Sequence, residues 1–274
     1  MRGPARLEGT VSTDRNCLSY WFPLLQAAGV PVPRTEIVTT DIDLNMILDG
    51  EDPVGWYDFY GHLEKACFMI GLPCFLRTGQ TSNKHEWKRS CHVTDLTTLP
   101  SHVCNLVEFS AMADMLGLPC NVWAVREMLP VNPVCSLPAY SDMPLVREVR
   151  AFVRDGRIQC LHPYWPRGSV EEGFSYRGNT KLPENFEVLY ALVSNWTYKA
   201  EKEIRDLLLQ LVKHFDGYWS VDLLDTARGW YVTDCAEGTN SYHDLECPHC
   251  PAQMRAQYER RNKIGIRPGD TQDD

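Results

Sequence analysis

The chain has 274 residues, a formal net charge of −9 and 44 % hydrophobic residues, a composition typical of a globular protein with a sizeable core. The acidic balance argues against a protein that coats nucleic acid, because such proteins usually present a basic surface. No run reaches the roughly 18–20 apolar residues that a membrane span requires, and the polar start lacks the apolar segment of a signal peptide.

The first half of the chain predicts helices mixed with short strands. Residues 1–16 are polar and are expected to form a flexible leader. Asn16 can cap a helix over 17–28, which ends at Gly29. The apolar spacing and turn residues that follow predict further elements, namely strands at 35–38, 74–77 and 121–128 and helices at 56–70 and 102–116.

The second half predicts two hairpins. Asp155-Gly156 joins two alternating runs, 145–153 and 157–162, and this dipeptide is a strong hairpin signal. A long amphipathic helix is expected at 199–215, and a hairpin with strands at 218–224 and 230–236 follows it. Residues after about 245 predict a polar tail that is partly disordered. Helices mixed with hairpins indicate an α+β fold with largely antiparallel sheets.

The last hairpin carries two aspartates, Asp222 and Asp234, which a short turn would bring opposite each other. Like charges at such positions repel. A divalent cation would remove this penalty, and Mg²⁺ prefers carboxylate oxygens. Glu237 or Asn240 could add a ligand. The alternative is that one aspartate faces solvent and the other caps a turn.

The strand before Asp155-Gly156 carries alternating charges. Alternation places Glu148 and Arg150 on one face and Arg147 with Val149 on the other. An arginine beside a glutamate in mid-strand forms either an ion pair on an exposed sheet or a phosphate-binding group held by its carboxylate. Both interpretations remain open from these residues alone.

Two further segments suit a nucleotide. Residues 73–84 form a strand that ends at Arg77 and a small polar loop that ends at Lys84. Exposed backbone N–H groups and a cation favour phosphate, although the P-loop pattern is absent and an ordinary surface loop is the alternative. Residues 122–130 form an apolar strand that ends at Glu127 and Met128. This strand either meets a plain loop or acts as a hinge whose backbone pairs with an adenine edge.

Taken in this order, the four segments resemble the ATP-grasp superfamily over about residues 20–245. The resemblance implies two lobes whose antiparallel sheets grip ATP and Mg²⁺. It also implies roles for particular residues: catalysis by Arg150 and Lys84, nucleotide binding by Arg77, Lys84, Glu127, Met128 and Arg147, and metal binding by Asp222, Asp234 and Glu237. Two departures stand out, because Arg77 replaces the family's usual lysine and Cys235-Ala236 replaces its usual x-Asn after the acid.

The activity that this resemblance implies is an ATP-dependent ligase. A small-molecule or peptide carboxylate would be activated as an acyl-phosphate and captured by an amine or another nucleophile. The alternatives are a nucleotidyl or phosphoryl transferase that acts on a nucleic-acid end, and a non-catalytic nucleotide-binding protein. The expected organisation is a leader at 1–16, a small α/β part at 17–60, the nucleotide-binding domain at 61–245 and a tail at 246–274.

The 11 cysteines are scattered without framework spacing, which indicates reduced thiols and a cytoplasmic protein. Cys247 and Cys250 form a single CxxC pair near His243. A structural zinc site normally needs four ligands, and Cys235 with His243 could complete such a set. An exposed tail with two thiols, or a redox pair, is the alternative.

Overall fold

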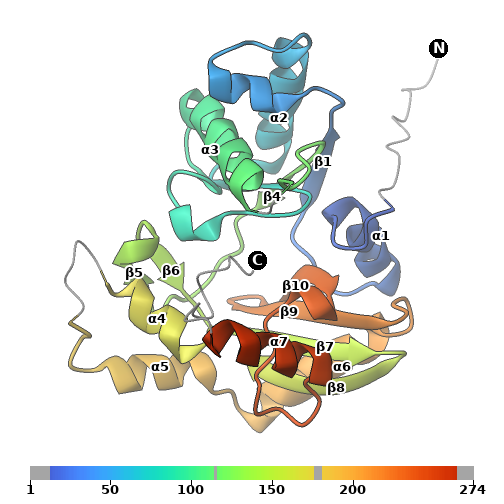
Figure 1. The fold of residues 1–274 in the computed structure, drawn as a ribbon, viewed down its shortest axis with the longest axis vertical. Helices are drawn as coiled ribbons and strands as arrows, with labels where there is room; N and C mark the ends of the chain where they lie inside the picture. The colour runs from blue at the N-terminus through green and yellow to red at the C-terminus, as the bar shows by residue number, and fades with distance from the viewer. Residues whose placement is uncertain (1–12, 114–115, 176–180, 264–274) are drawn as a thin grey trace.

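The computed structural model describes residues 13–113, 116–175 and 181–263, and these contain three antiparallel sheets that pack against helices (Figure 1). The predicted α+β class with antiparallel sheets is therefore confirmed. The two larger sheets define two lobes, and the third sheet and its helices lie beside them.

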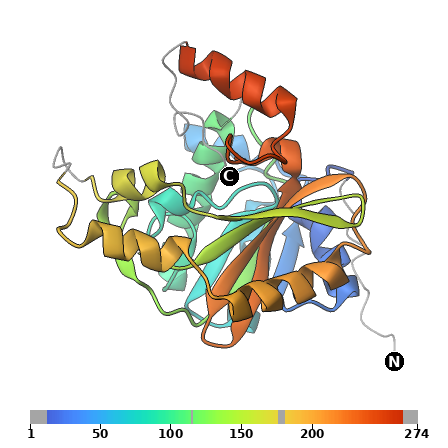
Figure 2. The same cartoon turned by 90° about the horizontal axis from the view of Figure 1, so that it is seen from below.

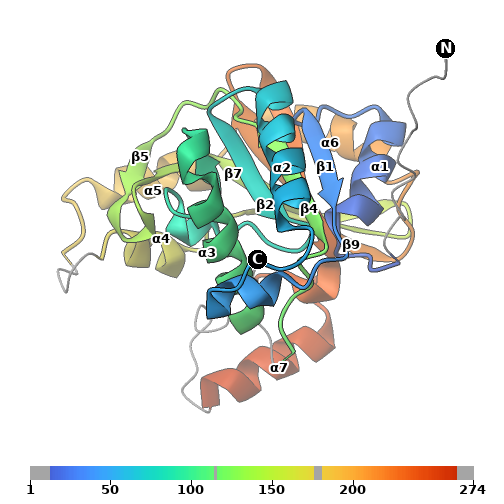
Figure 3. The ribbon, with the colours of Figure 1, turned by 90° about the horizontal axis from the view of Figure 1, so that it is seen from above.

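The first lobe is a four-stranded sheet in the order β1-β4-β2-β3. Its strands are β1 (Thr35–Thr39), β2 (Cys74–Thr78), β3 (His92–Val93) and β4 (Val122–Glu127). Two helices, α2 (Trp56–Ile70) and α3 (Leu99–Met112), cover one face of this sheet (Figure 3). Leu76, Trp123 and Val125 pack against the helices. Arg77 follows Leu76 and Arg126 follows Val125 in their strands, so both arginine side chains point to the other face of the sheet.

The second lobe is a four-stranded sheet in the order β10-β9-β7-β8. Its strands are β7 (Glu148–Arg154), β8 (Arg157–Pro163), β9 (Tyr218–Thr226) and β10 (Gly229–Glu237). Two helices, α1 (Leu18–Ala28) and α6 (Tyr198–Leu211), pack on one face together with Val149, Ala151 and Val221. Alternation then places Arg150 and Asp222 on the opposite face, which is turned toward the first lobe.

Smaller elements complete the description. Strands β5 (Cys135–Leu137) and β6 (Met143–Leu145) pack with helices α4 (Arg167–Gly173) and α5 (Phe186–Ser194). Five short 3-10 turns are η1 (Leu44–Asp49), η2 (Lys84–Glu86), η3 (Leu96–Thr98), η4 (Pro138–Tyr140) and η5 (Gly238–Asn240). Helix α7 (Ala252–Lys263) lies across the second sheet from α6 (Figure 2).

Several predicted elements are correct, and others differ from the structure in their caps or bounds. Helix α2 has the predicted bounds 56–70, and both predicted hairpins form. The predicted cap is wrong: Cys17 occupies the N-cap of α1 without a side-chain bond, and Asn16 instead accepts a hydrogen bond from the backbone N–H of Glu237. Helix α3 begins at Leu99, three residues before the predicted start, because Pro100 is suited to the first turn.

The expected division of the chain also differs in detail. Helix α2 runs continuously through residue 60, where the small N-terminal part was expected to end, and β1 belongs to the first sheet. The expected tail contains α7, whereas 264–274 and residues 1–12 of the expected leader lie outside the described residues. Among the described helices, none has the length and apolar character to cross a membrane.

The loop after β2 is held tightly at Gly79. The N–H of Gly79 donates to the carbonyl of Val122 at 2.7 Å, and its carbonyl accepts from the N–H of Leu18 at 2.7 Å. A Cβ at this position would lie 2.6 Å from Cys17 Sγ and 2.9 Å from Val122 Cβ. The polar loop that leads to Lys84 is therefore anchored at its start to both α1 and β4.

We expect Gly79→Ala to lower the free energy of unfolding by about 1–3 kcal/mol, because the added methyl group overpacks this junction. The matched control is Gly61→Ala inside α2, where a Cβ would meet no atom within 4 Å. Alanine at residue 61 should raise stability by roughly 0.5–1 kcal/mol, since glycine is a poor helix former. Urea unfolding measures both changes, and equal effects at the two glycines would contradict the packing.

Candidate functional site

Two neighbouring cavities lie between the lobes and share three charged residues, Arg77, Asp222 and Asp234. The first cavity is lined by both apolar and charged residues. The second cavity has a mixed lining that includes Arg150. The shared residues therefore stand at the boundary between the two cavities.

The two aspartates lie directly opposite each other on β9 and β10, as the sequence predicted. A β-bulge between Val232 and Asp234 produces this register, because regular pairing beyond Val232 would place Thr233 opposite Asp222. Without the bulge, Asp234 would turn to the core face of the sheet. The bulge therefore aims the second carboxylate into the cavities.

Each aspartate has an arginine partner. Arg150 donates to Asp222 through Nε at 2.8 Å and through a terminal nitrogen at 2.9 Å, and both side chains are buried. Arg77 of the first lobe pairs with Asp234 of the second at 2.9 Å. Burial, the largest single effect, would lower the pKa of Arg150, but the charge and hydrogen bonds of Asp222 together with nearby Tyr164 and Asp234 raise that pKa overall. The repulsion expected between the aspartates is thus offset by two guanidinium groups.

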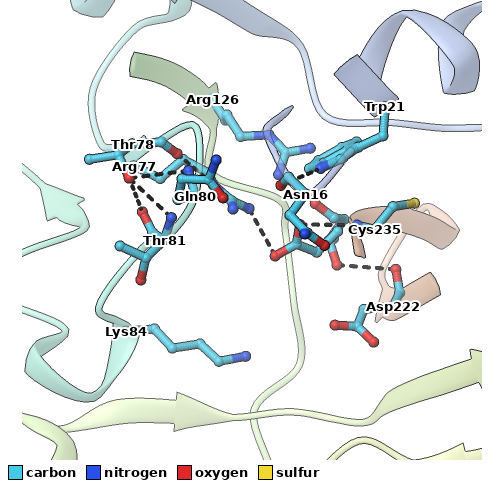
Figure 4. A network of polar contacts seen from close by, with 12 residues as sticks. Asn16, Trp21, Arg77, Thr78, Gln80, Thr81, Lys84, Arg126, Asp222 and Cys235 are labelled. Carbon is cyan, nitrogen blue, oxygen red and sulfur yellow. Dashed lines mark hydrogen bonds and ion pairs between the residues drawn. The ribbon is translucent and has the colours of Figure 1, made fainter. Parts of the chain in front are cut away.

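A third buried arginine, Arg126, lies close to Arg77 (Figure 4). Its Nε donates to Thr35 Oγ1 at 3.2 Å, and one terminal nitrogen donates to the carbonyl of Thr233 at 2.6 Å. The other terminal nitrogen is buried and finds no hydrogen-bond partner among the described residues. Burial and the charge of Arg77 lower the pKa of Arg126 to about 9, so the group stays charged at pH 7. A buried, charged donor without an acceptor is costly and marks a place for an anion.

Lys84 supplies a third cation from the loop on the opposite side of the first cavity. Its Nζ lies 3.6 Å from a carboxylate oxygen of Glu148 and 3.8 Å from the ring centre of Tyr164. The side chain extends toward Asp222 (Figure 4). Burial, the largest single effect, would lower the pKa of Lys84, yet Glu148, Tyr164 and Asp222 together raise the pKa overall. Lys84 is therefore a permanent cation in the cavity.

The lining of the first cavity also includes apolar residues. Strand β4 ends at Glu127, and the chain continues along the cavity wall through Met128 and Leu129. Glu127 accepts a hydrogen bond from the backbone N–H of Arg34 at 3.1 Å and pairs with Arg228 at 3.4 Å. Burial alone would raise the pKa of Glu127, but these partners lower it overall. The wall is completed by apolar side chains, which are Phe75, Trp87, Leu129, Val131, Met143, Val146 and Leu224.

No family model and no curated protein matches the sequence. Solved structures do match. The D-alanine–D-alanine ligase of Bacillus anthracis is 12 % identical with a TM-score of 0.45, and the alignment covers 82 % of this chain and 55 % of that one. A RimK domain protein, ATP-grasp, of Sphaerobacter thermophilus is 13 % identical with a TM-score of 0.44, over 81 % and 59 %.

Cdc123 of Schizosaccharomyces pombe is 16 % identical with a TM-score of 0.47, and the alignment covers 83 % of this chain and 87 % of that one. These similarities concern the fold alone. The chain spans 55 % and 59 % of the two bacterial proteins. What the site can do chemically follows from its own residues.

Two residues that the ATP-grasp resemblance assigned to the site lie outside both cavities. Arg147 precedes β7 on the face away from Arg150, and it pairs with Asp225 at 2.9 Å. Glu237 lies opposite Trp219 on the core face of the second sheet, and its carboxylate pairs with Arg15 at 2.9 Å. Asp234 and Glu237 are three residues apart in one strand, so alternation separates their side chains. Asn240, the other candidate ligand, does line the second cavity.

Arg126 is the site residue that the sequence analysis missed. A signal was present, because a single arginine follows the apolar run Val122–Val125 in the strand that ends at Glu127. Charged side chains are rarely buried unless they are paired. An arginine in an otherwise apolar strand therefore indicates either a buried partner or a ligand.

We expect the pair Arg150–Asp222 to couple strongly in a double-mutant cycle. Asp222→Leu alone should lower the free energy of unfolding by about 3–5 kcal/mol, because it leaves Arg150 buried without a counter-charge. Adding Arg150→Met should restore much of this loss, since neither charge then remains buried. Urea unfolding of the four proteins measures the coupling.

The control is Asp206→Leu, which removes an exposed partner of Lys202 on α6. That change should alter stability by less than about 1 kcal/mol, as is usual for surface pairs. Additive losses at residues 150 and 222 would contradict a buried, mutually dependent pair.

Proposed function

We propose that the first cavity binds ATP, with the base against Met128 and Leu129 and the phosphates beside Arg77, Arg126 and Lys84. The observation that carries this proposal is the buried terminal nitrogen of Arg126 that lacks an acceptor. A phosphate oxygen would supply one through a charge-assisted hydrogen bond. The apolar residues in its lining suit a planar base, so the cavity offers groups for both parts of a nucleoside triphosphate.

Asp222 and Asp234 fit Mg²⁺. Both offer carboxylate oxygens, the ligands that this ion prefers, and both line the two cavities. Each carboxylate has about four lone-pair positions, so the arginine contacts leave acceptor capacity on both. Bound Mg²⁺ would supply positive charge to the phosphate oxygens. Glu237 is left out of this proposed site because it lies on the other face.

The reaction that we propose for this arrangement is ligation through an acyl-phosphate. The second cavity would hold the carboxylate substrate, whose oxygen attacks the γ-phosphorus while the bond to the bridging oxygen breaks and ADP leaves. An amine or other nucleophile then attacks the acyl carbon, loses a proton and expels phosphate. Arg77 stands at the wall shared by the cavities and Arg150 lines the second cavity, and both would stabilise the negative charge on the transferred group.

We expect Arg126→Met to weaken ATP binding by roughly tenfold to hundredfold, the equivalent of the 1.5–3 kcal/mol typical of a hydrogen bond to a charged group. Calorimetric titration of ATP in the presence of Mg²⁺ measures this change. The matched control is Arg147→Met, the same substitution at an arginine outside both cavities. Equal affinities of the two variants would contradict the proposed phosphate position.

We expect hydroxylamine to trap the acyl-phosphate as a hydroxamate when the protein is incubated with ATP, Mg²⁺ and a pool of candidate acids. ADP should form in equal amount, because the γ-phosphoryl group is the one transferred. Arg150→Met should abolish hydroxamate formation. The product AMP would instead indicate nucleotidyl transfer and would contradict the proposed chemistry.

A non-catalytic nucleotide-binding role is the second candidate. One observation favours it: both aspartates are already paired with arginines, so metal binding must compete with or share those contacts. Tight ATP binding without ADP formation for any acid in the pool would support this candidate over the ligase.

A further inference from the structure

A cluster of four nitrogen and sulfur ligands lies at the edge of the second sheet, outside both cavities. Cys160 and His162 alternate on the edge strand β8, so their side chains share one face. His243 and Cys247 come from the segment between η5 and α7. One potential ligand atom from each residue lies within 4.8 Å of all the others.

The ring of His243 is oriented by its neighbours. Nε2 of His243 lies 3.3 Å from Cys160 Sγ, and Nδ1 of the same ring lies 2.7 Å from the hydroxyl of Tyr218. The ring stacks on Phe152 with centres 3.8 Å apart and planes 7° apart. His243 can therefore present Nε2 to the cluster while Tyr218 holds the other nitrogen.

His162 gives an independent indication of a ligand. Its Nε2 is buried and has no hydrogen-bond partner among the described residues. A buried imidazole nitrogen without a partner loses its hydration without compensation. A metal ion in the cluster would satisfy this atom.

We propose that Cys160, His162, His243 and Cys247 bind one structural Zn²⁺ ion. Two thiolates and two imidazoles in a closed four-ligand set suit tetrahedral zinc. Binding releases the two thiol protons, and the two thiolate charges then balance the charge of the ion. With Nε2 of His243 on the metal, Nδ1–H donates to the oxygen of Tyr218, the kind of outer contact that orients metal-bound histidines.

This ligand set differs from the one that the sequence suggested. Cys235, an expected partner of the CxxC pair, lies opposite Val221 in the core of the second lobe. Cys250, the second cysteine of the pair, has its sulfur 3.9 Å from the carbonyl of Pro251. The structure therefore separates the CxxC pair, using Cys247 with Cys160 in the cluster.

The proposed ion would fasten the C-terminal segment to the sheet. Apart from this cluster, the segment is held by the hydrogen bond between Ser241 and Ser220 and by a small apolar group around Cys250, Met254 and Tyr258. Apolar groups of this size provide little stability by themselves, and small units commonly rely on a metal or disulfide. Zinc would thus hold α7 in place and cover part of the edge strand β8.

Metal analysis of the purified full-length protein tests the site. We expect about one zinc per chain in the wild type and less than about a tenth of that in Cys160→Ser and Cys247→Ser, because each removes one of four ligands. Cys250→Ser and Cys104→Ser are the matched controls and should keep the ion. Wild-type protein without zinc after incubation with Zn²⁺, or loss of zinc in Cys250→Ser with retention in Cys160→Ser, would overturn the proposal.

Cobalt substitution tests the site in the wild-type protein, so the result does not depend on whether a variant folds. Chelator-treated wild type given Co²⁺ should show the intense visible absorption of tetrahedral cobalt and a thiolate charge-transfer band. The weak spectrum of six-coordinate cobalt would contradict the ligand set. Asp222→Asn should bind zinc normally, so this site and the proposed nucleotide site can fail independently.

Discussion

The paired charges of Arg77, Asp234, Asp222 and Arg150 are the constraint on which the rest of the site depends. Arg77 belongs to the first lobe and Asp234 to the second, so their ion pair crosses between the lobes. Arg150 and Asp222 are buried within the second sheet, where an unmatched charge would be destabilising. The arrangement therefore fixes the lobes relative to each other and sets the position of both carboxylates.

The charge of the site differs from the charge of the whole chain. The protein carries a net charge of −9, yet the charges of the site balance: Arg126 and Lys84 add two cations beside the paired set, against two further acids, Glu127 and Glu148. In a buried cavity these charges are weakly screened and act strongly on a bound ligand. Net charge argues against a broad nucleic-acid surface, but it does not report the local charge of a cavity.

Local pairing explains which parts of the site were predictable. Asp222 and Asp234 belong to one hairpin, so a short turn already implied that they would face each other, even though the bulge that completes the register was not foreseen. Arg126 lies opposite Phe75 through pairing between β4 and β2, which are distant in the sequence. That register depends on packing against α2 and α3, which local patterns do not specify. Cys160 and His243 are likewise distant in the sequence, so local patterns do not indicate that they lie together.

The two sites share one face of the second sheet, and this gives the C-terminal segment a structural role beyond its own stability. His162 lies opposite Arg150 on the neighbouring strand, and Arg150 lies opposite Asp222 on the next. An edge strand is otherwise exposed to fraying and to pairing with other chains. A metal that holds β8 against the C-terminal segment would restrain the strand next to Arg150. Because Arg150 grips Asp222 through two hydrogen bonds, that restraint would extend to the proposed metal ligand itself.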